Sequence, residues 1–164
     1  MPPALSLRPV APADREFLFE VYASTRAEEL AVVPWSPADK DAFLRMQFEA
    51  QDRDYRANYP AESFHLILDD GAPAGRLYLE RTPTELHLID IALLPAFRGR
   101  GRGTALLRDL LAEARAAQLP IRLYVEHLNP ARRLYFRFGF TDVEEHGPYW
   151  QMKWTPPPHT PTTP

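Results

Sequence analysis

The residues best suited to chemistry form one short run in which arginine and glycine alternate. Glycine has no Cβ, so a loop with three glycines can adopt positive φ and let its backbone approach a ligand closely. Where such a loop opens a helix, its free N–H groups and the helix dipole can hold an anion. Arginine adds permanent charge that forks onto phosphate oxygens. The run therefore predicts a phosphate-binding loop made of Arg98, Gly99, Arg100, Gly101, Arg102, Gly103 and Thr104.

The elements around this run would place it between a strand and a helix. Residues 86–94 are mostly apolar, as in a strand buried on both faces. Residues 104–118 carry leucines at helical spacing and stop before Pro120. Residues 121–125 alternate in polarity, which predicts another strand. Strand, loop, helix and strand form a βαβ unit, so the two strands are expected to be parallel.

The rest of the chain predicts further strands and helices in an α/β domain of the α+β type. The sequence Asn129-Pro130-Ala131 predicts the start of a short helix, with Gly139 as the glycine that follows its end. Ser36-Pro37 is typical of a helix start, with serine as the N-cap. The other expected strands cover about residues 5–8, 64–68, 75–80, 140–143 and 149–154, and a helix is expected from Asp14.

Other anion-binding motifs fit the glycine loop less well. A Walker A loop needs lysine before its final Ser or Thr, whereas Arg102-Gly103-Thr104 has none. The dinucleotide-binding fingerprint needs Gly-x-Gly-x-x-Gly, and the spacing here is Gly-x-Gly-x-Gly. RNA-binding Arg-Gly segments are usually longer, repeated and disordered. A third hypothesis, an Arg-Gly nucleic-acid binder, is disfavoured further by the net charge of −3.

Two motifs together resemble the Gcn5-related N-acetyltransferase (GNAT) superfamily. Arg98-x-x-Gly101-x-Gly103 resembles its acyl-CoA loop, and the run from Asn129 to Phe140 resembles its second signature. The resemblance implies the acyl-CoA N-acyltransferase fold, a mixed central sheet with splayed parallel strands flanked by helices. It also implies that the strands separate near Leu93-Leu94-Pro95, where proline cannot donate to the sheet.

The resemblance further implies acetyl-CoA as co-substrate, with no metal. Pantetheine would pair with the strand near Leu93 and Leu94, and the pyrophosphate would lie on the amides of residues 98–104. Asn129 would contact the cofactor arm, although asparagine at this junction is also a common N-cap. Ala131 and Arg132 belong to the same implied cofactor site.

Acetyl transfer needs an acid for the thiolate leaving group and a base for the amine. Tyr135 matches the family tyrosine and is the implied general acid, although a helical tyrosine can simply pack its ring. Asp90 is a candidate base, because a carboxylate in an apolar strand needs a partner or a raised pKa. His87, Glu80 and Glu126 are alternatives, and water can also do this work.

The whole-chain composition limits the remaining classes. The chain has 164 residues, 45% of them hydrophobic, and contains no cysteine, so disulfides, thiolate metal sites and a cysteine nucleophile are excluded. We find no signal peptide and no apolar run near the roughly 18 residues of a membrane span. We therefore expect a cytoplasmic protein, monomer or homodimer, with no nucleic-acid or membrane partner. Residues 1–154 are predicted to form one N-acetyltransferase domain, and 155–164 a proline-rich disordered tail.

Together these features predict an acyl-CoA-dependent N-acetyltransferase that moves an acetyl group to a primary amine of a small molecule, peptide or protein. The amine would attack the thioester directly in a ternary complex, since there is no cysteine to carry the acetyl group. The alternative is a non-catalytic module that binds or senses acyl-CoA. The sequence does not identify the acceptor.

Overall fold

The computed structural model describes residues 4–158, which divide into two compact units. The first unit comprises residues up to Glu80 together with Asp90–Arg102, and the second comprises Arg81–Ile89 and the chain from Gly103 onward. Hydrogen bonding orders the strands as β1-β2-β3-β4-β5-β7-β6 in one seven-stranded mixed sheet. The predicted α/β fold class is therefore confirmed.

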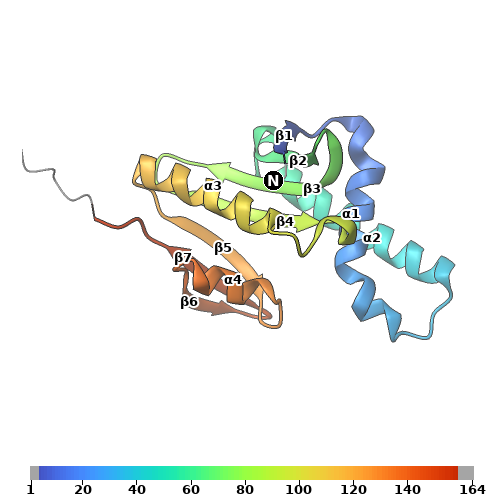
Figure 1. Cartoon of the computed structure of the whole chain (residues 1–164). Helices are drawn as coiled ribbons and strands as arrows, with labels where there is room; N and C mark the ends of the chain where they lie inside the picture. Colours follow the sequence, from blue (N-terminus) through green and yellow to red (C-terminus); the bar gives the residue numbers. More distant parts are fainter. Residues whose placement is uncertain (1–3, 159–164) are drawn as a thin grey trace, which may run out of the picture. The chain divides into compact units, whose positions relative to one another are not determined.

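The elements follow one another along the chain in the order given next, and Figure 1 labels the α-helices and the β-strands. They are β1 (Leu5–Pro9), η1 (Pro12–Asp14), α1 (Arg15–Ala31), α2 (Pro37–Asn58), η2 (Ala61–Ser63), β2 (Phe64–Asp69), β3 (Ala72–Arg81), β4 (Leu86–Leu93), η3 (Pro95–Phe97), α3 (Arg102–Ala117), β5 (Ile121–Glu126), α4 (Ala131–Arg137), β6 (Thr141–His146) and β7 (Tyr149–Trp154).

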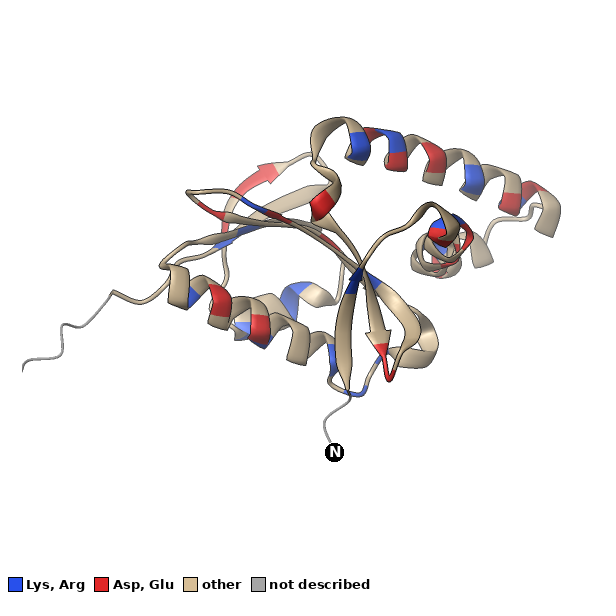
Figure 2. Ribbon diagram, turned by 90° about the horizontal axis from the view of Figure 1, so that it is seen from above, with Lys and Arg blue, Asp and Glu red and all other residues tan. Residues whose placement is uncertain are grey.

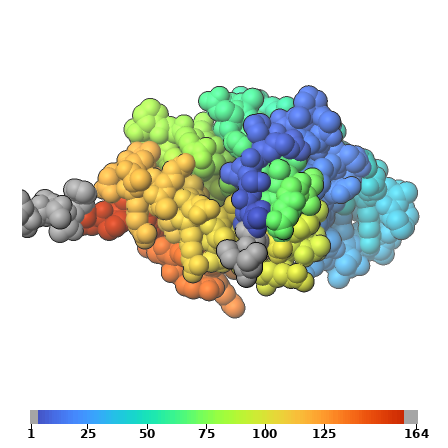
Figure 3. Space-filling model, turned by 45° about the horizontal axis from the view of Figure 1, so that its top comes forward, coloured from blue at the N-terminus to red at the C-terminus, as the bar shows by residue number. Residues whose placement is uncertain are grey.

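In the first unit, β1 pairs antiparallel with β2, and β2 with β3. Helix α2 begins as predicted, with the Ser36 hydroxyl accepting from the Asp39 N–H at 3.1 Å. Helices α1 and α2 contact each other through the rings of Phe19 and Phe48, with centroids 5.8 Å apart, and their atoms adjoin in Figure 3. Leu18 and Val21 of α1 and Phe48 of α2 are buried. The exposed part of α2 carries both signs of charge (Figure 2).

In the second unit, β4 and β5 pair in parallel, as the βαβ pattern predicts. Within this unit the pairing covers Leu86↔Ile121 to Leu88↔Leu123, and β5 then runs on to Glu126 against β7. Helix α3 buries one leucine-rich face, and Phe140 and Met152 are almost inaccessible.

Two expectations need correction. Strand β4 is buried only over its first three residues, and from Ile89 onward it is half-buried, so it is not covered on both faces along its length. The predicted strand from Phe140 to Val143 lies farther along the chain, as β6, because Phe140 is taken up by the turn that ends α4.

Residues 155–158 have no regular secondary structure, and the rest of the predicted tail, 159–164, lies outside the described residues. Among residues 4–158, no helix has the length and apolar character needed to cross a bilayer. The same part of the chain contains no group of three or more His, Asp or Glu side chains placed to hold a metal ion.

Candidate active site

The glycine loop joins the end of β4 to the start of α3 by a series of tight turns. Leu94 leads into the short helix η3, and the Arg98 N–H donates to the Pro95 carbonyl at 3.2 Å. Gly99 and Gly101 then adopt φ of +77° and +78°, values that residues with a Cβ reach only at a cost. Gly103 has no such requirement. The loop therefore depends on two glycines for its shape.

Two of the three loop arginines are held by protein atoms. Arg98 donates through Nε to the Leu93 carbonyl at 2.8 Å, and through Nη2 to the Ser24 hydroxyl of α1 at 3.1 Å. Arg102 donates through Nε to the Asp69 carboxylate at 2.5 Å. Arg100 is exposed. Arg98 and Arg102 therefore already have protein acceptors, whereas Arg100 faces solvent.

The end of β4 lies unusually close to β3. The Leu94 N–H donates to the Ala74 carbonyl at 2.8 Å. A Cβ on Gly75 would lie 2.1 Å from the Ala92 carbonyl oxygen and 2.9 Å from the Leu93 Cα, which is too close for any residue but glycine. The position of Leu93 and Leu94, two predicted cofactor contacts, therefore depends on Gly75.

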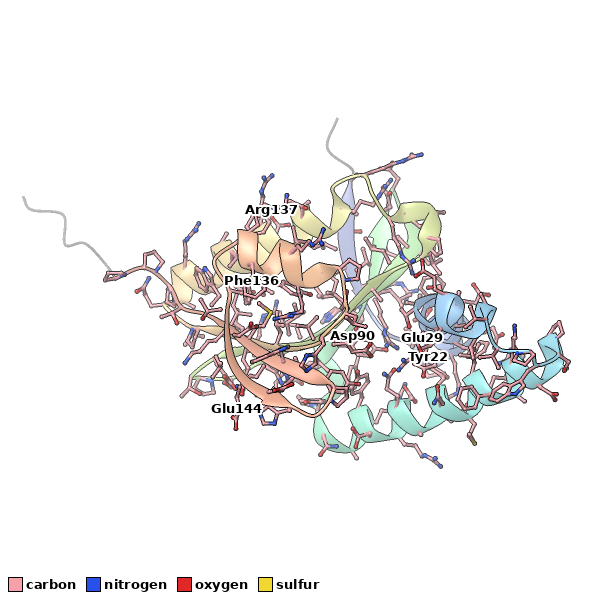
Figure 4. All side chains as sticks on the ribbon, turned by 90° about the horizontal axis from the view of Figure 1, so that it is seen from below. Tyr22, Glu29, Asp90, Phe136, Arg137 and Glu144 are labelled. Atoms are coloured by element: carbon pink, nitrogen blue, oxygen red, sulfur yellow. The ribbon has the colours of Figure 1, made fainter. Side chains whose placement is uncertain are left out.

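Asp90 forms an ion pair with a buried arginine of β3 (Figure 4 shows Asp90 on β4). Arg76 Nε donates to Asp90 Oδ2 at 2.6 Å, and Arg76 Nη2 also contacts this oxygen. Arg76 in turn donates to Gln51 Oε1 of α2 at 3.0 Å. The Asp90 side chain is 25% exposed, whereas that of Arg76 is 4% exposed. The partner that a carboxylate in this strand requires is thus Arg76.

Helix α4 ends in a motif that fixes Tyr135. The N–H of Gly139 donates to the Phe136 carbonyl, and the N–H of Phe140 to the Tyr135 carbonyl, both at 3.0 Å. Gly139 has φ +97°, so this is a Schellman ending with glycine at C′, as predicted. The rings of Tyr135 and Phe140 pack with centroids 5.5 Å apart, and Tyr135 is buried. Phe136 and Arg137 of the same helix are exposed (Figure 4).

The other residues of the second signature are engaged locally. The Asn129 Oδ1 accepts from the Ala131 N–H at 2.9 Å, so this side chain does act at the helix start. Arg132 donates to the Asp142 carboxylate of β6 at 2.8 Å, and its guanidinium lies over the rings of Phe136 and Trp150. Arg132 therefore joins α4 to β6.

His87 is the most strongly perturbed titratable group of the second unit. It lies on β4, is 4% exposed, and packs edge-on against Tyr124, with ring centroids 5.9 Å apart. Burial, followed by the nearby positive charge of Arg122, lowers the pKa of His87 to about 4. Arg122 also hydrogen-bonds Glu85 and lowers the pKa of that carboxyl. His87 is therefore neutral at pH 7, with the Tyr124 ring against it and the charge of Arg122 nearby.

The predicted site residues fall into two groups, one in each unit. Leu93, Leu94 and residues 98–102 belong to the first, together with Asp90. Gly103 and Thr104 belong to the second, and so do the residues of the second signature, Asn129, Ala131, Arg132 and Tyr135.

Sequence reasoning missed the residues that hold these groups, namely Ser24, Asp69, Gly75 and Arg76. Gly75 carried a usable signal, since an isolated glycine in a strand often marks close backbone approach. The others carried no local signal.

Comparison with known proteins supports the fold and the family. A family profile described as "Acetyltransferase (GNAT) family" matches residues 24–140. Over 79 residues, 48% of the chain, the sequence is 33% identical to mycothiol acetyltransferase of Nocardiopsis dassonvillei. This match covers 22% of that protein, so the chain spans about a fifth of the length of the curated relative.

Solved structures share the fold at low sequence identity. PaiA N-acetyltransferase from Thermoplasma acidophilum, solved in complex with coenzyme A, has a TM-score of 0.67 at 19% identity, covering 93% of this chain and 99% of that one. A protein from Corynebacterium glutamicum, described as histone acetyltransferase HPA2 and related acetyltransferase, has a TM-score of 0.63 at 23% identity, covering 99% and 100%. With the profile spanning most of its length, the chain belongs to the acetyltransferase (GNAT) family.

Proposed function

We propose that this protein is an acetyl-CoA-dependent N-acetyltransferase that acts on a primary amine of a small molecule, peptide or protein. The observation that carries the proposal is the glycine loop at the start of α3, with Gly99 and Gly101 at positive φ, in a chain of the GNAT family. The N-terminus of a helix has backbone N–H groups without helical acceptors and carries partial positive charge, so it favours an anion.

In this proposal the main chain of residues 98–104 binds the pyrophosphate of acetyl-CoA. The strand end at Leu93 and Leu94 pairs with the pantetheine amides in the manner of an added strand. Asn129, Ala131 and Arg132 contribute the remaining cofactor contacts.

The proposed chemistry is direct attack of a neutral amine on the thioester carbonyl carbon. The new C–N bond forms, the C–S bond breaks, and the leaving thiolate takes a proton. Tyr135 is the proposed donor of that proton, supported by its match to the family motif and by the Schellman ending that fixes it. An amine with a pKa of about 10.4 must lose a proton before attack, so a base or water relay is required.

Asp90 is the proposed base, oriented by Arg76. The contacts of Arg76 Nε and Nη2 both reach one carboxylate oxygen, Oδ2, and the Asp90 side chain is partly exposed. Asp90→Asn should therefore lower kcat/KM by about a hundredfold. An unchanged kcat/KM would assign deprotonation to water or to another group.

The function is tested first by binding and then by turnover. Calorimetric titration with acetyl-CoA should show one site, whereas no binding at millimolar ligand would refute the proposal. Coenzyme A release can be followed with a thiol reagent against amino acids, polyamines, aminoglycosides and peptide N-termini. The protein itself adds no background, because it has no cysteine. Binding without release across the whole panel would favour the alternative, a module that binds acyl-CoA without catalysis.

A further inference from the structure

We propose that Asp69, the last residue of β2, is a positioning residue for the glycine loop and acts through Arg102. This inference rests on the proposed function, because it concerns the loop that would bind the pyrophosphate of acetyl-CoA. Arg102 Nε donates to Asp69 Oδ2 at 2.5 Å, and the two side chains are only 12% and 8% exposed. The pair joins residues 33 positions apart in the sequence.

The carboxylate of Asp69 is held by a rigid strand end. Asp69 pairs with Leu5 of β1 and with Ala72 of β3, so its backbone has partners on both sides. The next residue, Asp70, donates its N–H to the Ala4 carbonyl at 3.0 Å. A carboxylate fixed in this way can hold the Arg102 side chain in one position.

Arg102 carries this constraint to the glycine loop. Its Nη1 lies 3.4 Å from the Phe97 carbonyl oxygen, and its guanidinium lies 5.4 Å from the centre of the Phe97 ring. Phe97 precedes the two positive-φ glycines and Arg102 follows them. The Arg102 side chain therefore joins the two ends of the segment from Phe97 to Arg102, and its ion pair with Asp69 attaches this segment to β2.

Electrostatics also indicate a positioning role. Arg102 is the first residue of α3, where the helix dipole disfavours a cation, and the first turn of this helix contains no acidic residue. Asp69 supplies the missing negative charge. Conversely, an unpaired Asp69 carboxylate near the loop would repel a phosphate, and Arg102 neutralises it. Neither residue needs to touch the ligand for the pair to affect its binding.

The decisive variant is Asp69→Asn, with Asp70→Asn as its matched control. Asp70→Asn is the same substitution one residue later. Asp70 lies at an exposed turn position with φ +48°, which asparagine tolerates. In calorimetry, Asp69→Asn should raise the Kd for acetyl-CoA about tenfold. Asp70→Asn should leave it within about twofold.

A truncated donor separates positioning of the loop from general destabilisation. S-acetyl-pantetheine lacks the pyrophosphate, so kcat/KM for this donor should be equal in wild type and Asp69→Asn, while kcat/KM for acetyl-CoA falls about tenfold. An equal loss with both donors, or a lowered Tm with an unchanged Kd, would overturn the inference.

Arg102 provides the second test. Arg102→Lys keeps the charge but loses the planar fork, and should weaken acetyl-CoA binding even if Asp69→Asn fails to fold. The double variant Asp69→Asn with Arg102→Lys should bind no more weakly than the weaker single variant, because the two residues act as one unit. Additive losses would overturn the inference. If the wild-type protein does not bind acetyl-CoA, the proposed function itself fails. If the wild type binds and Asp69→Asn binds equally well, only the inference about Asp69 fails.

Discussion

The two units offer their proposed functional groups in different ways. In the first unit these groups are mainly main-chain atoms, those of Leu93, Leu94 and the glycine loop, and side chains serve to hold them. In the second unit the key group is a side chain, the Tyr135 phenol, and main-chain hydrogen bonds at the end of α4 fix the backbone that carries it. Apart from the Asp90 carboxylate, we therefore expect the first unit to be sensitive to added bulk, and the second to the loss of the Tyr135 hydroxyl.

This difference changes how an arginine-rich motif is interpreted. The alternation of arginine and glycine suggests three cations facing an anion, yet Arg98 and Arg102 are bound to protein oxygens. In this loop the arginines shape the backbone at least as much as they supply charge. The comparison can be tested by variants that attack the main chain of one unit and the side chains of the other.

The largest effect is expected for Gly75→Ala. Its Cβ would meet the Ala92 carbonyl oxygen at 2.1 Å, so β4 or β3 must move. We expect the free energy of unfolding, measured in urea, to fall by about 3 kcal/mol or more. Gly103→Ala is the control, because open space surrounds that position, and it should cost no stability. A loss below about 1 kcal/mol for Gly75→Ala would contradict the close approach of the strands.

Acid should act on the second unit through His87. The folded-state pKa of about 4 lies below the ordinary value of 6.5, so between these values the unfolded chain binds a proton that the folded chain does not. Stability is full above pH 6.5 and falls by roughly 3 kcal/mol as the pH drops toward 4.

Urea unfolding at several pH values checks this expectation. His87→Leu should flatten the decline between pH 6.5 and 4.5, and His146→Leu, at an exposed position of β6, should not. Below pH 4.5 Glu85 adds its own loss, because Arg122 lowers the pKa of that carboxyl. An equally steep decline in His87→Leu would show that another group causes the acid sensitivity.

Tyr135→Phe tests the side-chain half of the comparison. Removing the hydroxyl should lower kcat about a hundredfold by taking away the proposed proton donor. The Kd for acetyl-CoA should change less than about twofold, since the ring and the main-chain turn remain. Tyr149→Phe, on β7, removes a half-exposed phenol and should leave kcat unchanged. An unaltered kcat in Tyr135→Phe would exclude this residue as the acid.

The smallest effect is expected for Gly101→Ala, which tests the main-chain half. At φ +78° a Cβ costs about 1–2 kcal/mol, which the loop can relieve by changing shape. The Kd for acetyl-CoA should rise about tenfold while kcat at saturation changes little. Gly71→Ala carries similar strain, at φ +82° in the β2–β3 hairpin, and should leave the Kd unchanged. Equal Kd values for the two variants would show that the shape of the glycine loop does not determine the affinity for acetyl-CoA.

Local signals predicted most of the fold. Ser36 and Gly139 marked helix ends correctly because a cap depends on residues adjacent in sequence. The spacing of leucines predicted α3, although the helix begins at Arg102 rather than at Thr104. The βαβ pattern predicted the parallel pairing of β4 with β5. Burial along β4 was predicted less well, because it depends on what covers each end of the strand.

The site was predictable only as a set of motifs. Residue type and spacing located the glycine loop and Tyr135, but not the contacts that hold them. Asp69 meets Arg102 across 33 positions and Ser24 meets Arg98 across 74, and nothing in the intervening sequence indicates either pair. Asp90 required a partner, yet Arg76 became evident only once β3 and β4 were folded.

The exposed strand β6 has a consequence for how copies of this protein behave in solution. It is the last strand in the sheet order, and all six of its residues are exposed, among them Asp142, Glu144 and Glu145. A terminal strand presents backbone donors and acceptors on which a second chain could grow a continuous intermolecular sheet. Negative charge along this edge opposes such growth at neutral pH. Removing this charge, as in Glu144→Gln combined with Glu145→Gln, should therefore favour fibrous self-assembly through this edge.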